Sequence, residues 1–171
     1  VYEAWYRIPH KSPDLYREAV YGLPELHREE LKGARLVANP GCYVTAATLA
    51  LAPLAAEGVL KGASVVGLSG VSGAGREAEG TAFAEVNENL KPYKAGGTHR
   101  HIPEMERNLG RILAQGRRVR THGEARAVRL SFTPHLVPMT RGILVTAEAE
   151  VEGAWSQESL EALYRDFYAG E

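Results

Sequence analysis

Cysteine, excess charge of either sign and long hydrophobic runs are all scarce in this sequence of 171 residues. Its one cysteine, Cys42, excludes an internal disulfide and favours a reducing compartment, so we expect a cytoplasmic protein. The 20 Lys and Arg residues nearly balance the 21 Asp and Glu residues, which argues against binding to a nucleic-acid backbone. Because no apolar run approaches the roughly 20 residues that span a bilayer, we expect no membrane partner.

What is present is typical of a folded globular domain, with 44% hydrophobic and 24% charged residues. No repeat and no Ser/Gly-rich linker divides the chain, so we expect one domain over residues 1–171. Hydrophobic periodicity predicts helices over 23–32, 42–57 and 102–115, and a last helix capped by Ser156. Strands are predicted over 35–38, 63–69, 128–133 and 142–151.

These elements predict an α+β domain with about four strands and four or five helices. A Pro-containing connection joins the strands at 128–133 and 142–151, which predicts that these two form an antiparallel pair. Pro53 predicts a kink or an end near Ala52 in the helix over 42–57, and Gly58 is its expected terminator. Residues 70–75 are too rich in glycine for regular structure, so a loop is expected there.

The first candidate for chemistry is Cys42, which follows a strand and an Asn-Pro-Gly turn and begins a predicted helix. Unpaired N–H groups and the positive end of the helix dipole favour a thiolate at this position. Gly41 would let a substrate approach closely. The alternative is a buried structural cysteine that packs as a small hydrophobe, but a strand-to-helix turn favours a nucleophile.

The second candidate is the run His99-Arg100-His101, which is followed by Glu104 at a helix start. Either imidazole could act as a general base beside a thiolate. A plainer interpretation is a set of polar residues at the start of a helix. A metal site formed by His99, His101 and Glu104 is a further alternative, but the positive charge of Arg100 disfavours it, so no metal is expected.

Two further segments are candidates for binding. Gly73, Gly75 and Ala78 fit the relaxed dinucleotide pattern G-x-G-x-x-A after a strand, but Gly80 interrupts the helix that a Rossmann turn needs. We therefore reject a Rossmann turn and keep a loop whose N–H groups face an anion or a cofactor edge. The segment 132–142 holds two prolines and presents His135, Thr140 and Arg141; a plain rigid turn is an equal alternative.

Four motifs in this order, 39–43, 69–75, 97–104 and 133–142, together resemble the N-acetyl-gamma-glutamyl-phosphate reductases of arginine biosynthesis, within the aspartate-semialdehyde-dehydrogenase-like superfamily. The stretch 21–25, Tyr-Gly-Leu-Pro-Glu, fits as well, so the resemblance covers essentially the whole chain. One departure is Val44, where this family has Pro after Cys-Tyr, but the change removes no functional group.

The resemblance implies an NADPH-dependent reductase in which Cys42 displaces phosphate from an acyl phosphate, and the resulting thioester is reduced to an aldehyde. It implies His99 as the acid/base partner of Cys42, with N–H groups near Cys42 holding the oxyanion. Substrate contacts are implied for His101, Arg100, Tyr93, Arg141 and Glu104. The nicotinamide side of NADP would lie against Ser72, Gly73, Ala74 and Gly75.

The resemblance also implies the catalytic and dimerisation domain of the glyceraldehyde-3-phosphate-dehydrogenase-like enzymes, with a mixed, largely antiparallel sheet. We expect both ends to be edges of a longer protein whose nucleotide-binding domain is absent from this chain, and a homo-oligomer, dimer or tetramer. Related reductases of aminoadipyl or aspartyl phosphate are alternatives. So are a Cys/His hydrolase without cofactor and a non-catalytic dimerisation module.

Overall fold

The computed structural model describes residues 2–75, 83–117 and 128–171, so that Ala78 and Gly80 of the glycine pattern lie outside the described residues. Its contacts divide the chain into two compact units, one of residues 42–154 and one of residues 1–41 with 155–171. The larger unit holds every candidate site residue of the sequence analysis. We call it the sheet unit, and the other the terminal unit.

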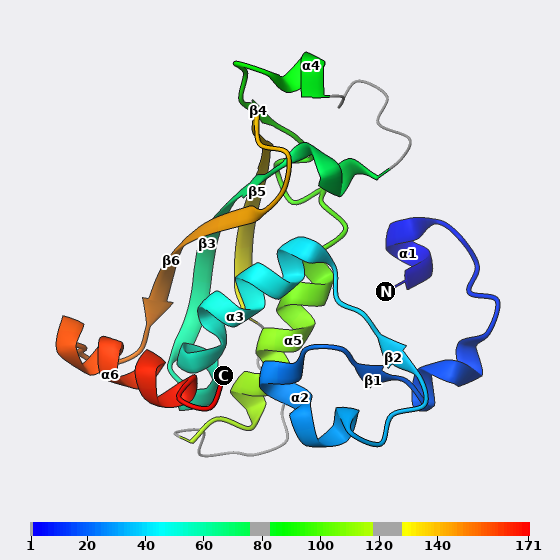
Figure 1. Ribbon diagram of the computed structural model, residues 1–171. Coiled ribbons are helices and arrows are strands. Elements are labelled where there is room, and N and C mark those ends of the chain that lie inside the picture. Colours follow the sequence, from blue (N-terminus) through cyan, green and yellow to red (C-terminus); the bar gives the residue numbers. More distant parts are fainter. Residues whose placement is uncertain (1, 76–82, 118–127) are drawn as a thin grey trace. The chain divides into compact units, whose positions relative to one another are not determined.

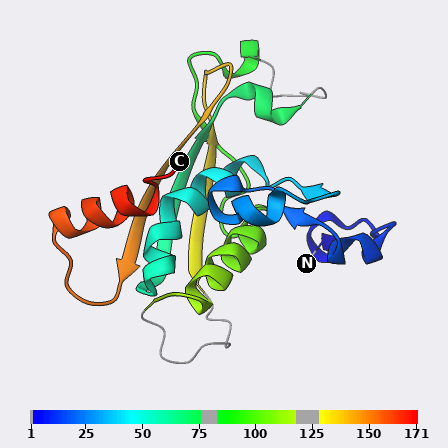
Figure 2. The same ribbon diagram turned by 60° about the horizontal axis from the view of Figure 1, so that its bottom comes forward.

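The sheet unit is built on a four-stranded sheet in the order β4-β5-β3-β6. Its strands are β3 (Leu60–Ser69), β4 (Lys91–Pro92), β5 (Arg129–Leu136) and β6 (Ile143–Val151). β3 pairs with β5 in parallel and with β6 antiparallel, and β4 pairs with β5 antiparallel. The helices α3 (Cys42–Glu57) and α5 (Ile102–Ala114) pack together over one face of this sheet (Figures 1 and 2). The predicted α+β fold with a mixed sheet is confirmed.

The sequence analysis was wrong about the pairing of the last two strands. β5 and β6 do not pair, because β3 lies between them and bonds to both along its length. The connection between β5 and β6 passes over the end of β3, where the N–H of Val137 donates to Ser69 and the N–H of Gly70 donates to Gly142. The Pro-containing segment is therefore a crossover and not a hairpin turn, and β5 continues through Pro134 to Leu136.

Two further local expectations differ from the structure. Helix α3 contains Pro53 and still runs to Glu57, where Gly58 follows with a positive φ of 85°. Pro53 is buried with most of this helix, so packing outweighs the lost hydrogen bond. The glycine-rich segment after β3 forms a short 3₁₀ helix, η2 (Val71–Ala74), because its N–H groups bond to the crossover: Val71 to Met139 and Ser72 to Thr140.

The terminal unit contains short elements and a two-stranded parallel sheet of β1 (Val20–Tyr21) and β2 (Val37–Ala38). Its helices are α1 (Tyr2–Tyr6), the 3₁₀ helix η1 (Pro13–Arg17), α2 (Pro24–Leu31) and α6 (Gln157–Phe167). The predicted cap of α6 is confirmed by Ser156, whose side chain accepts from the N–H of Ser159, and α2 begins with Pro24. Arg28 and Glu171 form an ion pair in this unit.

The sheet unit also holds a short helix, α4 (Phe83–Val86), which the sequence analysis did not predict. Across the described ranges, no helix is both long and apolar enough to cross a membrane.

Candidate active site

Cys42 is the first residue of α3, as the sequence analysis expected, and its thiol is free and exposed. A sulfur at the first turn faces N–H groups that have no partner within the helix, together with the positive end of the helix dipole. The structural alternative, a buried cysteine packed as a small hydrophobe, is excluded by the exposure of this side chain.

Tyr43 follows the exposed cysteine but is itself buried in the core, with 2% of its surface exposed. Its hydroxyl donates to the carbonyl of His135 over 3.2 Å and accepts from the hydroxyl of Tyr93 over 3.3 Å. The ring lies against β3 at Gly67, where a Cβ atom would come within 2.6 Å of Cε1 of Tyr43. The sequence analysis missed the roles of Tyr43 and Gly67; a glycine inside a strand was the one available signal.

The two histidines lie in the same core region. His99 is 5% exposed and His101 is 8% exposed, and their ring centroids are 4.7 Å apart. The His99 ring also meets Tyr43, Tyr93 and Phe132 edge to face, with centroid distances of 5.7, 5.8 and 5.3 Å. The main-chain N–H of His101 donates to Nδ1 of His99 over 3.2 Å.

Burial and charge set the protonation states in this cluster. Burial lowers the pKa of His99 to about 4, and the electrostatic interactions with His101, Lys94 and Arg100 lower it further. Burial likewise lowers the pKa of His101, while the nearby Glu104 carboxylate opposes the shift. Both imidazoles are therefore neutral at neutral pH.

Cys42 also interacts electrostatically with Tyr93 and Tyr43. Burial raises the pKa of Tyr93, the negative charge of Cys42 raises it further, and Arg100 opposes the rise. Burial and the bond to Tyr93 raise the pKa of Tyr43. The structure thus brings together Cys42, Tyr93, His99, Arg100 and His101, with Glu104 beside His101 in the first turn of α5.

The remaining candidates form a second group. Ser72 of η2 donates its N–H to the carbonyl of Thr140, which places Ser72, Gly73, Ala74 and Gly75 beside the segment that carries Arg141. All five of these residues are exposed. Among the described residues, no hydrogen bond links this group to Cys42 or His99. The part of the chain that the structure covers also holds no group of three or more His, Cys, Asp or Glu residues suited to a metal ion.

A protein-family model described as semialdehyde dehydrogenase, dimerisation domain, matches residues 42–171, so the chain belongs to this family. Over all of its 171 residues it is 99% identical to the N-acetyl-gamma-glutamyl-phosphate reductase of Thermus thermophilus, of which it covers 50%. It is 53% identical to the reductase of that name from Symbiobacterium thermophilum, with 99% of this chain and 47% of that protein covered. The chain thus spans about half the length of the curated relatives it matches.

Solved structures share the fold at low sequence identity. The aspartate semialdehyde dehydrogenase of Francisella tularensis matches with a TM-score of 0.64 and 12% identity, over 88% of this chain and 52% of that one. The aspartate semialdehyde dehydrogenase with NADP from Candida albicans matches with a TM-score of 0.58 and 14% identity, over 90% of this chain and 47% of that one.

Proposed function

We propose that the protein carrying this chain reduces N-acetyl-gamma-glutamyl phosphate to N-acetyl-glutamate semialdehyde and phosphate, a step of arginine biosynthesis. The observation that carries this proposal is the exposed thiol of Cys42 at the start of α3, next in sequence to Tyr43, whose ring contacts the buried His99 and His101. The identity of 99% to a reductase of that name supports the choice of substrate. An exposed catalytic thiol fits the reducing cytoplasm.

The chemistry divides into two steps at Cys42. The thiolate attacks the acyl carbon, the C–O bond to phosphate breaks, and the departing phosphate takes a proton from water. NADPH supplies a hydride when bound. The thioester then becomes a tetrahedral adduct, whose C–S bond breaks to release the aldehyde and restore the Cys42 thiolate.

The other site residues take the roles that the family resemblance implies, and their contacts with one another support this. His99 is the imidazole partner of the reacting groups, and Tyr93 and His101 complete the wall of the site. Arg100 and Arg141 carry positive charge for the phosphate and carboxylate of the substrate, since a guanidinium binds such groups bidentately. Glu104 stands beside His101 and acts on its charge.

The segment from Ser72 to Gly75 fits the ring side of a nicotinamide nucleotide better than its phosphates. The N–H groups of Ser72, Gly73 and Gly75 all donate to carbonyl oxygens of the protein, so they do not form an anion nest. Among the described residues, none lies within 4 Å of the place where a Cβ of Gly75 would stand, which is compatible with a flat ring there.

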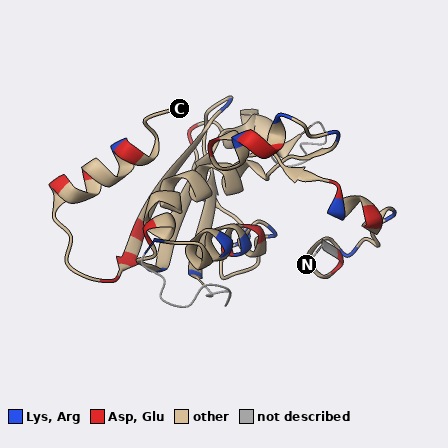
Figure 3. Cartoon of the chain, turned by 90° about the horizontal axis from the view of Figure 1, so that it is seen from below, with Lys and Arg blue, Asp and Glu red and all other residues tan. Residues whose placement is uncertain are grey.

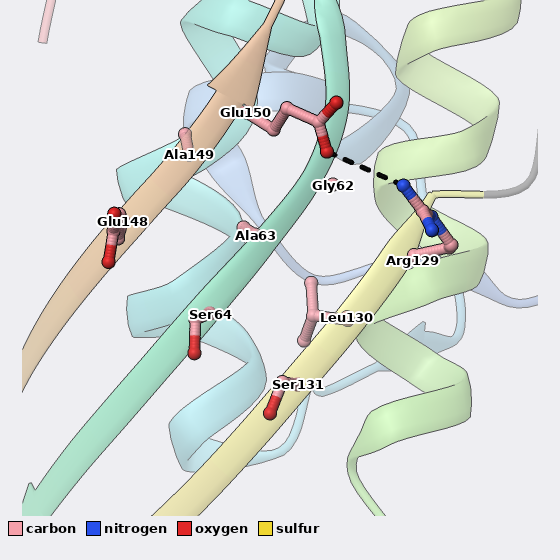
Figure 4. Close-up of a pocket in the computed structure, with 9 residues that line it drawn as sticks. All are labelled: Gly62, Ala63, Ser64, Arg129, Leu130, Ser131, Glu148, Ala149 and Glu150. Carbon is pink, nitrogen blue, oxygen red and sulfur yellow. Dashed lines mark hydrogen bonds and ion pairs between the residues drawn. The ribbon is translucent and has the colours of Figure 1, made fainter.

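We also assign self-association to the face of the sheet opposite α3 and α5, as the family description of a dimerisation domain suggests. Figure 4 shows this face, where β3, β5 and β6 border a shallow hollow of about 590 Å³. Gly62 has no side chain, so Arg129 reaches across β3 to Glu150 over 3.4 Å (Figure 4). Val66 and Leu144 are 41% and 58% exposed on the described surface, which favours a second copy packing there.

The test of the function uses the full-length protein, meaning this chain within a polypeptide of the length of its relatives. In the reverse direction we expect reduction of NADP only when phosphate and N-acetyl-glutamate semialdehyde are both present. Cys42→Ser is expected to lower kcat by at least about 1,000-fold with the fold intact, because the thioester cannot form. Circular dichroism and the unfolding temperature serve as controls for folding.

Other outcomes separate the alternatives. Phosphate-independent hydrolysis of an activated ester would favour a Cys/His hydrolase over the reductase. A preference for aspartate semialdehyde or aminoadipate semialdehyde would show that the substrate is that of a related reductase. Full activity in Cys42→Ser would overturn the proposed mechanism and leave a non-catalytic dimerisation module.

A further inference from the structure

The main chain at the start of α5 determines which nitrogen of His99 carries the proton. The N–H of His101 donates to Nδ1 of His99 over 3.2 Å. A main-chain N–H group can only donate, so Nδ1 must offer a lone pair and holds no proton. A neutral imidazole with an unprotonated Nδ1 carries its single proton on Nε2.

Burial keeps this imidazole neutral over the working range of pH. The ring is 5% exposed, and burial lowers the pKa of His99 to about 4, with the electrostatic interactions with His101, Lys94 and Arg100 lowering it further. The other titratable groups against the ring are the phenols of Tyr43 and Tyr93, whose pKa values burial raises, so both are uncharged. Protonation of Nδ1 would in addition turn an acceptor into a donor facing the His101 N–H.

Packing also prevents the ring from turning over. A half-turn about Cβ–Cγ would bring a carbon to the place of Nδ1 and leave the buried N–H of His101 without a partner, which is unfavourable. The ring is held edge to face by Phe132 at 80° and by His101 at 77°. Among the residues that the structure describes, none is hydrogen-bonded to Nε2 of His99, which therefore remains available to a ligand.

We propose that His99 works as a neutral hydrogen-bond donor through Nε2–H, and that the main-chain amide of His101 is the positioning group that imposes this polarity. This inference rests on the proposed function. An Nε2 that already carries a proton cannot take one from the Cys42 thiol. It can instead donate to the acyl oxygen, which becomes negative when the thiolate attacks and again when the hydride arrives.

The proton balance of the reaction is consistent with an imidazole of His99 that stays neutral throughout. The Cys42 thiolate enters the first step and is restored by the second, and the only proton taken up goes from water to the departing phosphate. His99 therefore neither gains nor loses a proton. Its Nε2–H stabilises the negative oxygen in both steps, as a donor in an oxyanion hole does.

A direct test is the tautomer of His99, observed by NMR in the full-length protein labelled with ¹⁵N in its histidines. Long-range ¹H–¹⁵N spectra should show a bare Nδ1 and a protonated Nε2 for His99, unchanged between about pH 5.5 and 8. The resonance is assigned with His99→Gln, and His101→Ala should leave the tautomer unchanged because it keeps the main-chain amide. A proton on Nδ1, or protonation of both nitrogens in this range, would overturn the inference.

Two substitutions test the donor role through activity. Gln at position 99 places an amide N–H near the position of Nε2, whereas Asn places its amide near Nδ1. We expect His99→Gln to keep a kcat roughly 100-fold above that of His99→Asn, with similar KM values. Equal losses in the two variants would show that an ionisable imidazole is required and would contradict a donor role. The NMR result does not depend on turnover, so an inactive protein with the expected tautomer would count against the proposed function alone.

Discussion

At the scale of single residues, the candidate site depends on where the Tyr43 ring is held. Its hydroxyl bridges Tyr93 and the carbonyl of His135, and its ring lies edge to face with His99 and Phe132. Cys42 precedes this anchored residue on the first turn of α3. The position of the thiol therefore follows from a contact between the first turn of α3 and the strand β3.

Gly67→Ala tests that anchor. The new Cβ would stand 2.6 Å from Cε1 and 2.8 Å from Cδ1 of Tyr43, and 3.1 Å from Cε2 of Phe132. Since rings packed on both sides cannot withdraw freely, we expect a loss of about 1–3 kcal/mol in the free energy of unfolding. Urea denaturation of the full-length protein measures it, and kcat should fall with the displaced ring.

The matched control for that variant is Gly33→Ala, where none of the described residues lies within 4 Å of the new Cβ. It should change the stability by no more than about 0.5 kcal/mol. If the two variants unfold at the same urea concentration, the close packing of Tyr43 on Gly67 does not contribute to stability.

At the scale of elements, a serine before a helical turn does not always cap it. Ser12 and Ser156 both precede helical turns, and Ser12 is followed by Pro13. Only Ser156 forms a capping box, in which its hydroxyl accepts from the N–H of Ser159 and its own N–H donates to the Ser159 hydroxyl over 3.0 Å. The side chain of Ser12 makes no capping bond to the short 3₁₀ helix η1.

The two serines therefore give a paired prediction. Ser156→Ala should lower the free energy of unfolding by about 1 kcal/mol, because an N–H group at the start of α6 loses its acceptor. Ser12→Ala should be neutral. Thermal denaturation of both variants checks this, and equal melting temperatures would show that the box adds nothing. Asp and Glu outnumber Arg on α6 (Figure 3). Melting temperatures compared at low and high salt therefore separate the effect of these charges, which salt screens, from the effect of the cap.

At the scale of the whole molecule, the sheet unit has one covered face and one open face. The open face carries matched rows across three strands: Val66 of β3 stands between Thr133 of β5 and Thr146 of β6, and Ser64 stands between Ser131 and Glu148. Apart from Glu148, the side chains of these rows are small and uncharged, which allows a second sheet to approach to about 10 Å. This surface fits a symmetric partner better than a small ligand, because its hollow is shallow and lined by strands.

Val66→Glu tests self-association through this face. A carboxylate at the middle of the interface would be buried without a partner, so we expect the dimer to dissociate or weaken by at least about 100-fold. Sedimentation velocity of the full-length protein at several concentrations measures this. Arg111→Glu on α5, across the sheet from the open face, is the control and should leave the mass unchanged. A Val66→Glu protein that still sediments as the parent does would place the interface elsewhere.

Much of the local structure could be predicted because it depends on neighbours in sequence. The cysteine at the start of a helix, the Ser156 cap and the Pro24 start of α2 each involve groups within four residues of one another. The strand alternation that marks β5 and β6 is equally local. The same locality explains the errors: Pro53 argues for a break, but the burial of α3 against β6 and α5 outweighs it.

By itself the sequence determined most of the helices and strands of the sheet unit and the family resemblance, since these follow from residue type and short spacing. Only the tertiary structure decided that β3 lies between β5 and β6, because strand order depends on pairings between residues about 65–90 positions apart. The tertiary structure also decided the hydrogen bonds and the burial of the site residues. Tyr43 and His135, 92 positions apart in the sequence, are joined by one hydrogen bond, and the burial of His99 beside the N–H of His101 sets its proton on Nε2.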